Sequence, residues 1–555
     1  MQLPKPTHSN FSDLINDIKR GQIKIPQFQR EFVWSLQKSA ALIDSVIKGY
    51  PIGTFIFWGT KDRLRSIRNL GNVNFPPPRD GETIWFVLDG QQRLTSLFAA
   101  LNGLTIERES GQNDNFSEIY IDLNAKKDEQ IVIMDIANRE EYSFIRLKDL
   151  LYGDLSLLAS FPKHYHSILS EYKRRIEGYD FSVIEVADVP LNIATEIFTR
   201  INVGGKPLTL FEIMVAKTYD EEHNFDLAQK FEELINNLNP LNYETISDAT
   251  ILQLISLIIR RDCKKQTILQ LEKDEFINKW PEAIAAIESA VEYFRNTYRI
   301  PVSQLLPYNT LLVPFGYFFF YHPDKPDGDQ KILLEDFFWR SSLAGRYSSA
   351  VESKLAQDAK RIDLILKRQS PNYEWGIDLS PKFILENGWF NAGRSFIKAL
   401  LCLYAYQIPK SFSDNALVNI SNNWLKQANS KNYHHFFPRA YLGKQGVEEG
   451  KINNIVNIVI VDDYLNKREI RAKAPLVYMK GFSEKNPSLL ETLNSHLIGD
   501  LDEFGVWSDN YELFLNKRAS VISQELQKRL VKREIDKRGQ ISRVDDLEEE
   551  MTRFE

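Results

Sequence analysis

Two adjacent histidines in the last quarter of the chain are well suited to chemistry on a phosphodiester. They stand in YHHFFP as His434 and His435, and Asn457 and Asn466 follow them. A neutral imidazole can take a proton from water, and a divalent ion can stabilise the leaving oxygen. A further group must fix the orientation of the imidazole. These four residues could therefore form a hydrolytic site with one metal ion.

Packing offers an alternative explanation for the same residues. An isolated pair of histidines beside aromatic residues is more often a partly buried packing element than a site. Asn457 lies between Val456 and Ile458, so it could also occupy a turn or a bulge. Pro438 and the two asparagines, at their spacing from the histidines, favour the hydrolytic site.

The pattern resembles that of HNH, or ββα-metal, nucleases, in particular the C-terminal half of GmrSD-type modification-dependent restriction enzymes. The resemblance covers roughly residues 390–530. It implies that His435 is the general base, that Asn457 braces it through the backbone, and that His434 and Asn466 bind the metal. The family more often has Asp or Glu in place of His434, and the two histidines could exchange roles. An imidazole suits Mn²⁺, Zn²⁺ or Ni²⁺ better than Mg²⁺.

Three polar motifs follow one another in the first part of the chain: IPQFQREFVW (25–34), VLDGQQRL (87–94) and FTRINVGGKPL (198–208). In the second motif, WFVL has the pattern of a buried strand and RLTSLFAAL that of a helix. The DGQQR residues are therefore predicted to lie at a strand-to-helix turn. The free N–H groups at the start of a helix favour an anion there.

The side chains of this turn suit a phosphate group. Gly90 would allow a ligand to approach the backbone, and Arg93 can hold a phosphate through two N–H groups. Asp89 can bind Mg²⁺ or orient water, while Gln91 and Gln92 can donate hydrogen bonds. Taken alone, DGQQR is more often a capped turn with solvated polar residues.

Together the three motifs resemble the DGQQR-type domain, which is related to the ParB and sulfiredoxin fold. That domain forms the N-terminal half of GmrSD-type enzymes and of phosphorothioate-sensing SspE-like and BrxU-like proteins. The resemblance covers about residues 8–225 and implies binding and hydrolysis of GTP, ATP or another NTP. No G-x-x-x-x-G-K-[ST] sequence occurs in the chain, so the nucleotide site cannot be a conventional P-loop.

Residues of the first and third motifs extend the predicted site. Arg200 and Asn202 lie beside the Gly-Gly turn of the third motif. They could complete a nucleotide or DNA pocket, or form a purely structural network. The resemblance suggests that Gln29 and Arg30 contact phosphate or modified DNA.

The surrounding pattern predicts a multidomain α+β protein. Residues 1–225 read as a ParB/sulfiredoxin-like α/β domain that binds nucleotide and senses DNA, with strand-like TFIFW and IWFVL and a helix ended by Gly49. Residues 226–385 read as a helical connector. Residues 386–555 read as a mainly helical domain that carries the HNH motif, with charged helices at the C-terminus.

Composition restricts the class of protein. With 555 residues, 43% of them hydrophobic, the chain is long enough for several cores. Two cysteines argue against a disulfide framework, and no apolar run is long enough to span a membrane. We therefore expect a cytoplasmic protein without a membrane partner. The net charge of −6 means that any DNA surface must be local.

One candidate for such a surface is the stretch 517–538, which holds eight Lys or Arg residues. A solvated helix face with ion pairs is the favoured interpretation of this stretch. The long terminal helices could also support a homodimer.

The resemblance to GmrSD-type enzymes implies a modification-dependent DNA endonuclease of a type IV restriction system that defends against phage. We expect DNA, an NTP and a divalent metal (Mg²⁺, Mn²⁺ or Ni²⁺) as partners and cofactors. Two alternatives stay open: an NTP-dependent DNA-binding regulator with a vestigial nuclease domain, and an RNA-cleaving effector of abortive infection. Whether NTP hydrolysis activates or restrains cleavage does not follow from the residues.

Overall fold

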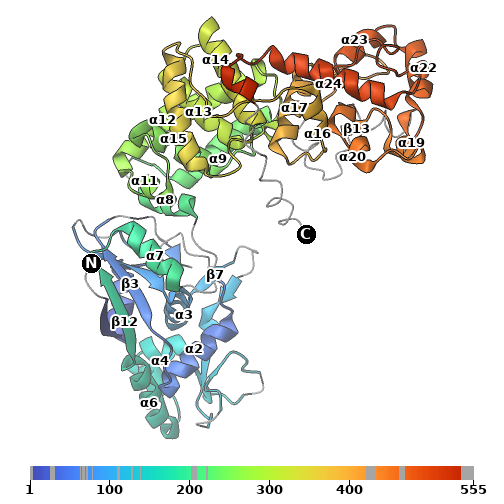
Figure 1. Cartoon of the computed structure of the whole chain (residues 1–555). Coiled ribbons are helices and arrows are strands. Elements are labelled where there is room, and N and C mark those ends of the chain that lie inside the picture. The colour runs from blue at the N-terminus through green and yellow to red at the C-terminus, as the bar shows by residue number, and fades with distance from the viewer. Residues whose placement is uncertain are drawn as a thin grey trace. The chain divides into compact units, whose positions relative to one another are not determined.

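The protein divides into two compact units, Met1–Leu227 and Ala228–Glu555 (Figure 1). The structure is a computed structural model that describes residues 4–25, 32–62, 64, 69–70, 73–77, 79, 81–108, 113–126, 129–137, 139–201, 209–220, 223–420, 433–461, 465 and 469–538. The second unit contains both the expected connector and the expected nuclease part. Their division into separate domains stays a prediction.

A five-stranded mixed sheet forms the centre of the first unit. Its order is β1-β12-β3-β6-β2, with β12 parallel to β3 and β2 parallel to β6, while the other two neighbouring pairs are antiparallel. The strands are β1 (Lys5–Asn10), β2 (Ile23–Lys24), β3 (Phe55–Thr60), β6 (Ile84–Asp89) and β12 (Asp180–Ala187). The predicted strands TFIFW and IWFVL are confirmed as β3 and β6, apart from the first residue of TFIFW.

Helices and short strands complete the first unit. The helix predicted before Gly49 is confirmed: Ser35 caps its start, and Gly49 ends it with φ 75°. Its apolar face packs against α3 and α6 in the core. The helices are α1 (Phe11–Lys19), α2 (Leu36–Lys48), α3 (Gln91–Asn102), α4 (Leu147–Tyr152), α5 (Leu155–Ala159), α6 (His166–Glu177), α7 (Leu191–Ile201) and α8 (Leu210–Thr218).

Three small sheets add to this unit. They are formed by β4 (Asn69–Leu70) with β5 (Val73–Asn74), by β7 (Thr105–Glu107) with β8 (Asn113–Asn115), and by β10 (Val132–Ile133), β9 (Tyr120–Asp122) and β11 (Phe144–Arg146). The mixed α/β character predicted for this part of the chain is therefore confirmed. The finer assignment to a ParB-like fold stays a prediction.

The second unit is mainly helical, as the sequence pattern predicts. The apolar helix α13 is buried over most of its length and contacts α10, α12 and α15, because a helix that is apolar on all sides cannot face water. Its helices are α9 (Leu227–Leu238), α10 (Asp248–Arg260), α11 (Lys265–Leu269), α12 (Lys273–Asn296), α13 (Leu312–Tyr321), α14 (Gly328–Leu343), α15 (Val351–Leu366), α16 (Pro381–Glu386), α17 (Ser395–Tyr406), α19 (Arg439–Lys444), α20 (Glu449–Ile452), α22 (Pro475–Lys485), α23 (Leu489–Asn494) and α24 (Tyr511–Gln527).

A two-stranded antiparallel sheet lies among these helices. It consists of β13 (Tyr433–His435) and β14 (Ile458–Ile460). A 3₁₀ turn, Ile455–Asn457, leads directly into β14. This turn contacts α24, and β14 contacts α17, so both are anchored in the core of the unit.

The C-terminal part of this unit differs from the expected long charged helices. Helix α24 ends at Gln527, and the chain continues without helix until the 3₁₀ turn Glu534–Arg538. Arg518, Arg529 and Arg533 have side chains that are 15% exposed or less, and each has an ionic or backbone partner. The interpretation of 517–538 as a solvated face is therefore wrong for these three arginines, because packing partners distant in the sequence bury them.

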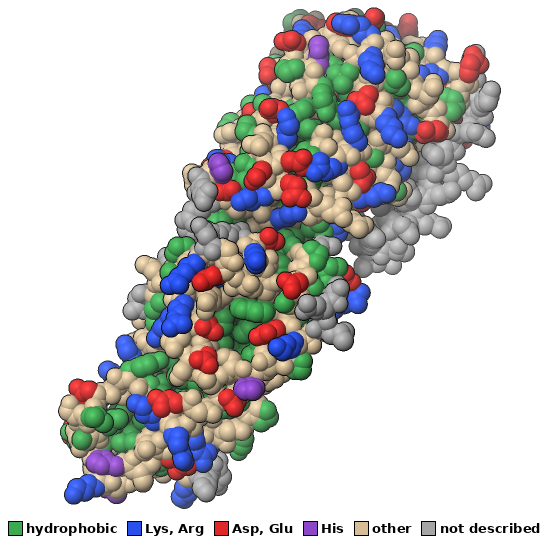
Figure 2. Space-filling model, turned by 90° about the vertical axis from the view of Figure 1, so that its left-hand side faces the viewer, with side chains coloured by type: hydrophobic (Ala, Val, Ile, Leu, Met, Phe, Trp, Pro, Cys, Tyr) green, Lys and Arg blue, Asp and Glu red, His purple; other side chains and the backbone are tan. Residues whose placement is uncertain are grey.

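Two surface features bear on the partners of the protein. In the described part of the chain, no helix is both long and apolar enough to cross a bilayer. On the face shown in Figure 2, Lys and Arg side chains are interspersed with Asp and Glu.

Candidate functional site

The two adjacent histidines lie on β13. His434 pairs with Val459 and His435 with Ile458 across the small sheet. Successive side chains of a strand point to opposite faces, so the two imidazoles face different sides of the sheet. His434 is 6% exposed, whereas His435 is partly buried.

The ring of His435 is held by a residue that the sequence analysis did not single out. Its Nε2 lies 3.2 Å from Oδ1 of Asn453. Burial lowers the pKa of His435; the hydrogen bond to Asn453 and the charge of Glu449 oppose this shift, and Arg439 reinforces it. The net effect favours the uncharged ring.

Asn457 is fully buried and holds the loop that follows His435. Its Oδ1 accepts from the backbone N–H of Phe437 at 2.9 Å, and its Nδ2 donates to the carbonyl oxygens of Phe437 and Ile452 at 3.0 and 3.1 Å. Its own carbonyl accepts from the N–H of Phe436 at 2.7 Å. All of these partners are backbone groups, so Asn457 fixes the path of the chain just after β13.

Helix α24 supports the Asn457 turn from the other side. Arg518 is fully buried and donates through Nη1 to the carbonyl oxygens of Val456 and Ile458, at 2.6 and 2.7 Å. Its guanidinium also stacks over the Tyr404 ring at 4.9 Å. A buried charge of this kind is tolerated when its N–H groups have hydrogen-bond partners. Because those partners lie on both sides of Asn457, this arginine fixes the junction between the 3₁₀ turn and β14.

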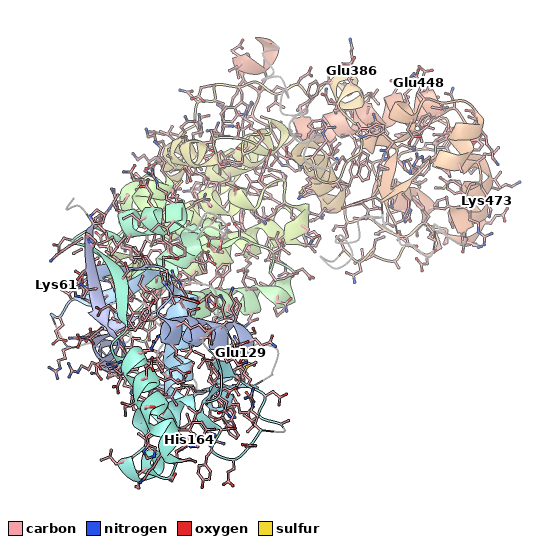
Figure 3. All side chains as sticks on the ribbon, turned by 90° about the horizontal axis from the view of Figure 1, so that it is seen from below. Lys61, Glu129, His164, Glu386, Glu448 and Lys473 are labelled. Carbon is pink, nitrogen blue, oxygen red and sulfur yellow. The ribbon has the colours of Figure 1, made fainter. Side chains whose placement is uncertain are left out.

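The structure describes only part of the expected metal site. Asn466, the second expected metal ligand, lies outside the described residues. Among the residues that are described, no three His, Cys, Asp or Glu side chains gather as a metal site. In Figure 3, Glu386 marks the last residue of α16, and Glu448 is the residue just before α20.

The DGQQR motif forms the strand-to-helix turn that its sequence predicts. Strand β6 ends at Asp89, Gly90 adopts φ 90°, and α3 begins at Gln91. A Cβ on Gly90 would lie 2.5 Å from Cδ1 of Phe55. Packing against β3 and the positive φ thus require glycine here, independently of any ligand.

The guanidinium of Arg93 is tied to the neighbouring loop. It donates to the carbonyl oxygens of Ile52 and Thr54 at 2.8 and 3.0 Å, and to Asp89 at 3.0 Å. The side chains of Arg93 and Asp89 are 18% and 33% exposed. The loop approaches closely because Gly53, with φ 89°, has no Cβ to collide with the guanidinium. The contact between the turn and residues 52–54 was not predicted from the sequence.

Gln92 connects the second motif to the end of the first. Its Oε1 accepts from the backbone N–H groups of Val33 and Trp34, at 2.8 and 3.3 Å. Gln91 and Gln92 are both buried, so they are not the solvated residues of an ordinary capped turn. Gln29 and Arg30 of the first motif lie outside the described residues.

Of the third motif, the structure describes only residues 198–201. Arg200 lies on α7, which contacts β6; its side chain is 79% exposed and paired with Glu196 at 2.6 Å. Asn202 lies outside the described residues. After the motif, Thr209 and Glu212 form a capping box at the start of α8, as their spacing predicts.

The geometry of the first unit agrees with its match to a known family. Residues 11–219 match the model of the GmrSD restriction endonuclease, N-terminal domain. The first unit contains a GmrSD-type N-terminal domain. The same residues include β6, the DGQQR turn and the arginine-bound loop.

The similarity to a second protein extends beyond the GmrSD-type domain. The chain is 25% identical over 549 residues to an uncharacterized protein, MJ0686, of Methanocaldococcus jannaschii. The match covers 88% of this chain and 90% of that protein, so it includes much of the second unit. The family model itself ends before the second unit, and the HNH assignment there depends on the residues around β13.

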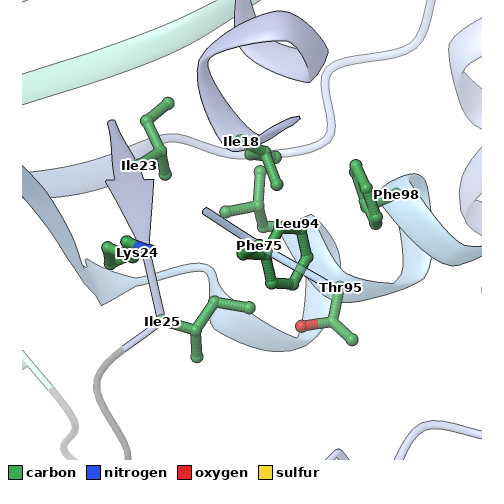
Figure 4. A pocket seen from close by; sticks show the side chains of 8 residues that line it. All are labelled: Ile18, Ile23, Lys24, Ile25, Phe75, Leu94, Thr95 and Phe98. Carbon is green, nitrogen blue, oxygen red and sulfur yellow. The ribbon is translucent and has the colours of Figure 1, made fainter. Parts of the chain in front are cut away.

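The GmrSD-type domain also contains a small apolar hollow between α1, β2 and α3 (Figure 4). Leu94, Thr95 and Phe98 line it from α3, directly after the DGQQR residues. Lys24 lies at its wall and donates to the carbonyl of Pro76 at 2.8 Å. Asp89 to Arg93 are not part of this lining, so the hollow is separate from the expected phosphate contacts.

Proposed function

We propose that the chain is a metal-dependent HNH endonuclease that cleaves modified DNA in defence against phage. Its GmrSD-type domain supports the restriction-endonuclease class. The observation that carries the nuclease part is the arrangement around β13: a partly buried His435 ring that is hydrogen-bonded to Asn453, followed by a loop held by the buried Asn457.

In the proposed reaction His435 acts as the general base. It takes a proton from a water molecule whose oxygen forms a new bond to phosphorus, while the bond from phosphorus to the leaving sugar oxygen breaks. The electron pair of the broken bond stays on the leaving oxygen, which takes a proton from a solvent water, and the imidazole passes its own proton to solvent, which restores the base. Asn457 contributes by fixing the backbone after His435, so that the ring keeps its position relative to the substrate.

The donor atoms of the two predicted metal ligands suit a divalent ion. An imidazole nitrogen of His434 and an amide oxygen of Asn466 are both ligands for first-row metals. We propose that these two residues hold Mg²⁺, Mn²⁺ or Ni²⁺, with Mn²⁺ and Ni²⁺ favoured by the imidazole. The bound ion would supply charge stabilisation of the leaving oxygen.

We further propose that the GmrSD-type domain binds and hydrolyses an NTP, such as GTP or ATP, at the DGQQR turn. Asp89, Gly90, Gln91, Gln92 and Arg93 would provide the contacts together with Arg200 and Asn202, whereas Gln29 and Arg30 would contact phosphate or modified DNA. Since Arg93 donates to two backbone carbonyls, a phosphate would have to replace those bonds or use the remaining N–H groups.

A parallel digestion tests the proposed function. The substrates are unmodified plasmid, DNA with glucosylated hydroxymethylcytosine, phosphorothioate DNA and total RNA. Each is incubated with Mg²⁺, Mn²⁺ or Ni²⁺, with and without GTP or ATP. We expect cleavage of modified DNA in the presence of metal, with a rate that changes when an NTP is added.

Two variants show whether His435 is responsible for the cleavage. His435→Ala should abolish cleavage, whereas the exposed His164→Ala in the first unit should retain it. Cleavage of RNA but not DNA would replace the proposal by the RNA-cleaving effector. DNA binding without cleavage under any metal would support the vestigial nuclease and overturn the proposed activity.

A further inference from the structure

The contact between Asn453 and His435 defines how the imidazole is protonated. Asn453 is the residue after α20, and its backbone N–H donates to the carbonyl of Glu449 at 2.9 Å. Its side chain lies between two partners. Nδ2 donates to the carbonyl of Phe390 at 3.2 Å, and Oδ1 faces Nε2 of His435 at the same distance.

The direction of these hydrogen bonds follows from the chemistry of the partners. The Phe390 carbonyl can only accept, so the NH₂ group of Asn453 must face it. The amide oxygen then faces the histidine, and an oxygen of this kind can only accept as well. Nε2 of His435 must therefore carry the proton, which leaves Nδ1 as the basic nitrogen of the neutral ring.

The amide of Asn453 is itself immobilised by residues 385–390. The N–H of Phe390 donates to the carbonyl of Asn453 at 2.8 Å, and the N–H of Ile455 donates to that of Gly388 at 2.7 Å. Gly388 has no space for a side chain, because a Cβ there would lie 2.6 Å from the carbonyl oxygen of Ile384. This close backbone contact holds the side-chain amide of Asn453 opposite the His435 ring.

We propose that Asn453 is a positioning residue that fixes the ring orientation and the Nε2–H tautomer of His435. Nδ1 is then the atom that accepts the proton of the attacking water. The inference rests on the proposed nuclease function. It differs from the role of Asn457, whose partners are backbone groups on the loop after β13.

Three variants of the full chain test this role. Asn453→Ala removes the acceptor for Nε2–H. Asn453→Asp keeps an acceptor oxygen for the ring but loses the donor to Phe390. Asn391→Ala is the control: Asn391 is exposed, and its side chain accepts one hydrogen bond, from the N–H of Gly393 at 2.9 Å, so its loss leaves the contacts of the imidazole in place.

Cleavage kinetics distinguish a role of Asn453 in positioning the His435 ring from a purely structural role. We expect Asn453→Ala to lower kcat by about 10- to 100-fold, the range typical for groups that orient an active-site histidine. Its KM for DNA should stay within about twofold of the wild-type value, because Asn453 does not contact the substrate. Asn453→Asp should recover most of the lost kcat. Equal losses in both variants, or no loss in Asn453→Ala, would overturn the proposal.

Nuclear magnetic resonance of ¹⁵N-histidine-labelled protein gives a second readout that needs no activity. We expect the neutral His435 ring of the wild type to show the Nε2–H tautomer, with its signals identified by their loss in His435→Gln. The signals should persist in Asn391→Ala and change in Asn453→Ala. A wild-type ring protonated at Nδ1 would refute the inference even if the variants fold poorly. Absence of cleavage together with the Nε2–H tautomer would instead count against the proposed function alone.

Discussion

At the scale of single residues, the environment of His435 depends on side chains that satisfy backbone groups. Asn457 makes three side-chain hydrogen bonds to Phe437 and Ile452 while fully buried. A buried polar group that loses its partner costs about 1–3 kcal/mol. The turn before β14 is therefore expected to be sensitive to this one amide.

Replacing Asn457 by alanine should destabilise the second unit by about 3 kcal/mol or more, because three buried backbone groups lose their partner. The measurement is urea unfolding of the full chain. Asn391→Ala provides the comparison: this exposed asparagine accepts one hydrogen bond from Gly393, and its loss should cost well under about 1 kcal/mol. Equal effects of the two substitutions would contradict the bracing role of Asn457.

His496 should make the second unit sensitive to acid. Burial lowers the pKa of this residue to about 4, its hydrogen bond to the Lys410 carbonyl opposes the shift, and Arg518 adds to it. Between pH 6.5 and 4 the unfolded chain binds a proton that the folded chain does not, so the free energy of unfolding falls as the pH falls. The loss over this range is roughly 3 kcal/mol.

Unfolding measured at pH 7 and pH 4.5 tests this sign. His496→Gln should reduce the difference in stability between the two pH values, whereas the exposed His223→Gln should leave it unchanged. If His496→Gln showed the full wild-type loss, burial of this imidazole would not be the cause.

At the scale of elements, the DGQQR turn illustrates how packing determines sequence. Gly90 joins β6 to α3 with a positive φ and lies against Phe55 of β3. Gly81 also has a positive φ, of 77°, but a Cβ on it would meet nothing within 4 Å. Alanine substitutions at these two glycines therefore distinguish the cost of backbone strain from the cost of steric overlap.

Gly81→Ala should lower the stability of the first unit by about 1 kcal/mol through backbone strain alone. Gly90→Ala should lower it by roughly 3 kcal/mol, since overlap with Phe55 adds to the strain. Thermal unfolding of both variants in the full chain measures the difference. A smaller effect for Gly90→Ala than for Gly81→Ala would show that the β6–α3 junction adjusts freely.

The segment after α24 is a second element whose role depends on distant contacts. Asp536 accepts from Nη1 and Nη2 of the fully buried Arg340, both at 2.7 Å, and from the backbone N–H of Ile377 at 3.0 Å. Arg533 pairs with the buried Asp336 of α14 at 2.8 Å. These contacts attach the segment that follows α24 to α14.

Asp536→Ala should destabilise the second unit by about 3 kcal/mol, because it leaves the buried charge of Arg340 with one carboxylate fewer. Glu386→Ala is the control, since Glu386 forms an exposed pair with Lys382 at 3.8 Å and should contribute less than about 0.5 kcal/mol. Urea unfolding distinguishes the two. Similar midpoints for both variants would mean that the segment is not a structural fastening.

The elements that could be predicted from the sequence are those set by local patterns. Apolar periodicity and capping residues located β3, β6, α2 and the start of α8. The contact of Arg93 with residues 52–54 and that of Asn453 with His435 could not be predicted in this way. Both join residues far apart in the chain, and their geometry is set by tertiary packing rather than by neighbouring sequence.

At the scale of the whole molecule, the family match and the candidate nuclease site lie in different units. The GmrSD-type domain occupies the first unit, and the His435 site occupies the second. The net charge is −6, and on the face in Figure 2 the two signs of charge are interspersed. Recognition of DNA is therefore expected to depend on local contacts rather than on bulk attraction, with a moderate dependence on salt.

The rate of phosphodiester hydrolysis by His435→Ala, relative to wild type, tests the central claim most directly. The measurement is a single-turnover cleavage of modified DNA at saturating protein and Mn²⁺, with unfolding curves to show that both proteins are folded. Loss of a general base should lower the rate by about 10²- to 10⁴-fold. A rate within twofold of wild type would contradict the assignment of His435 as the base.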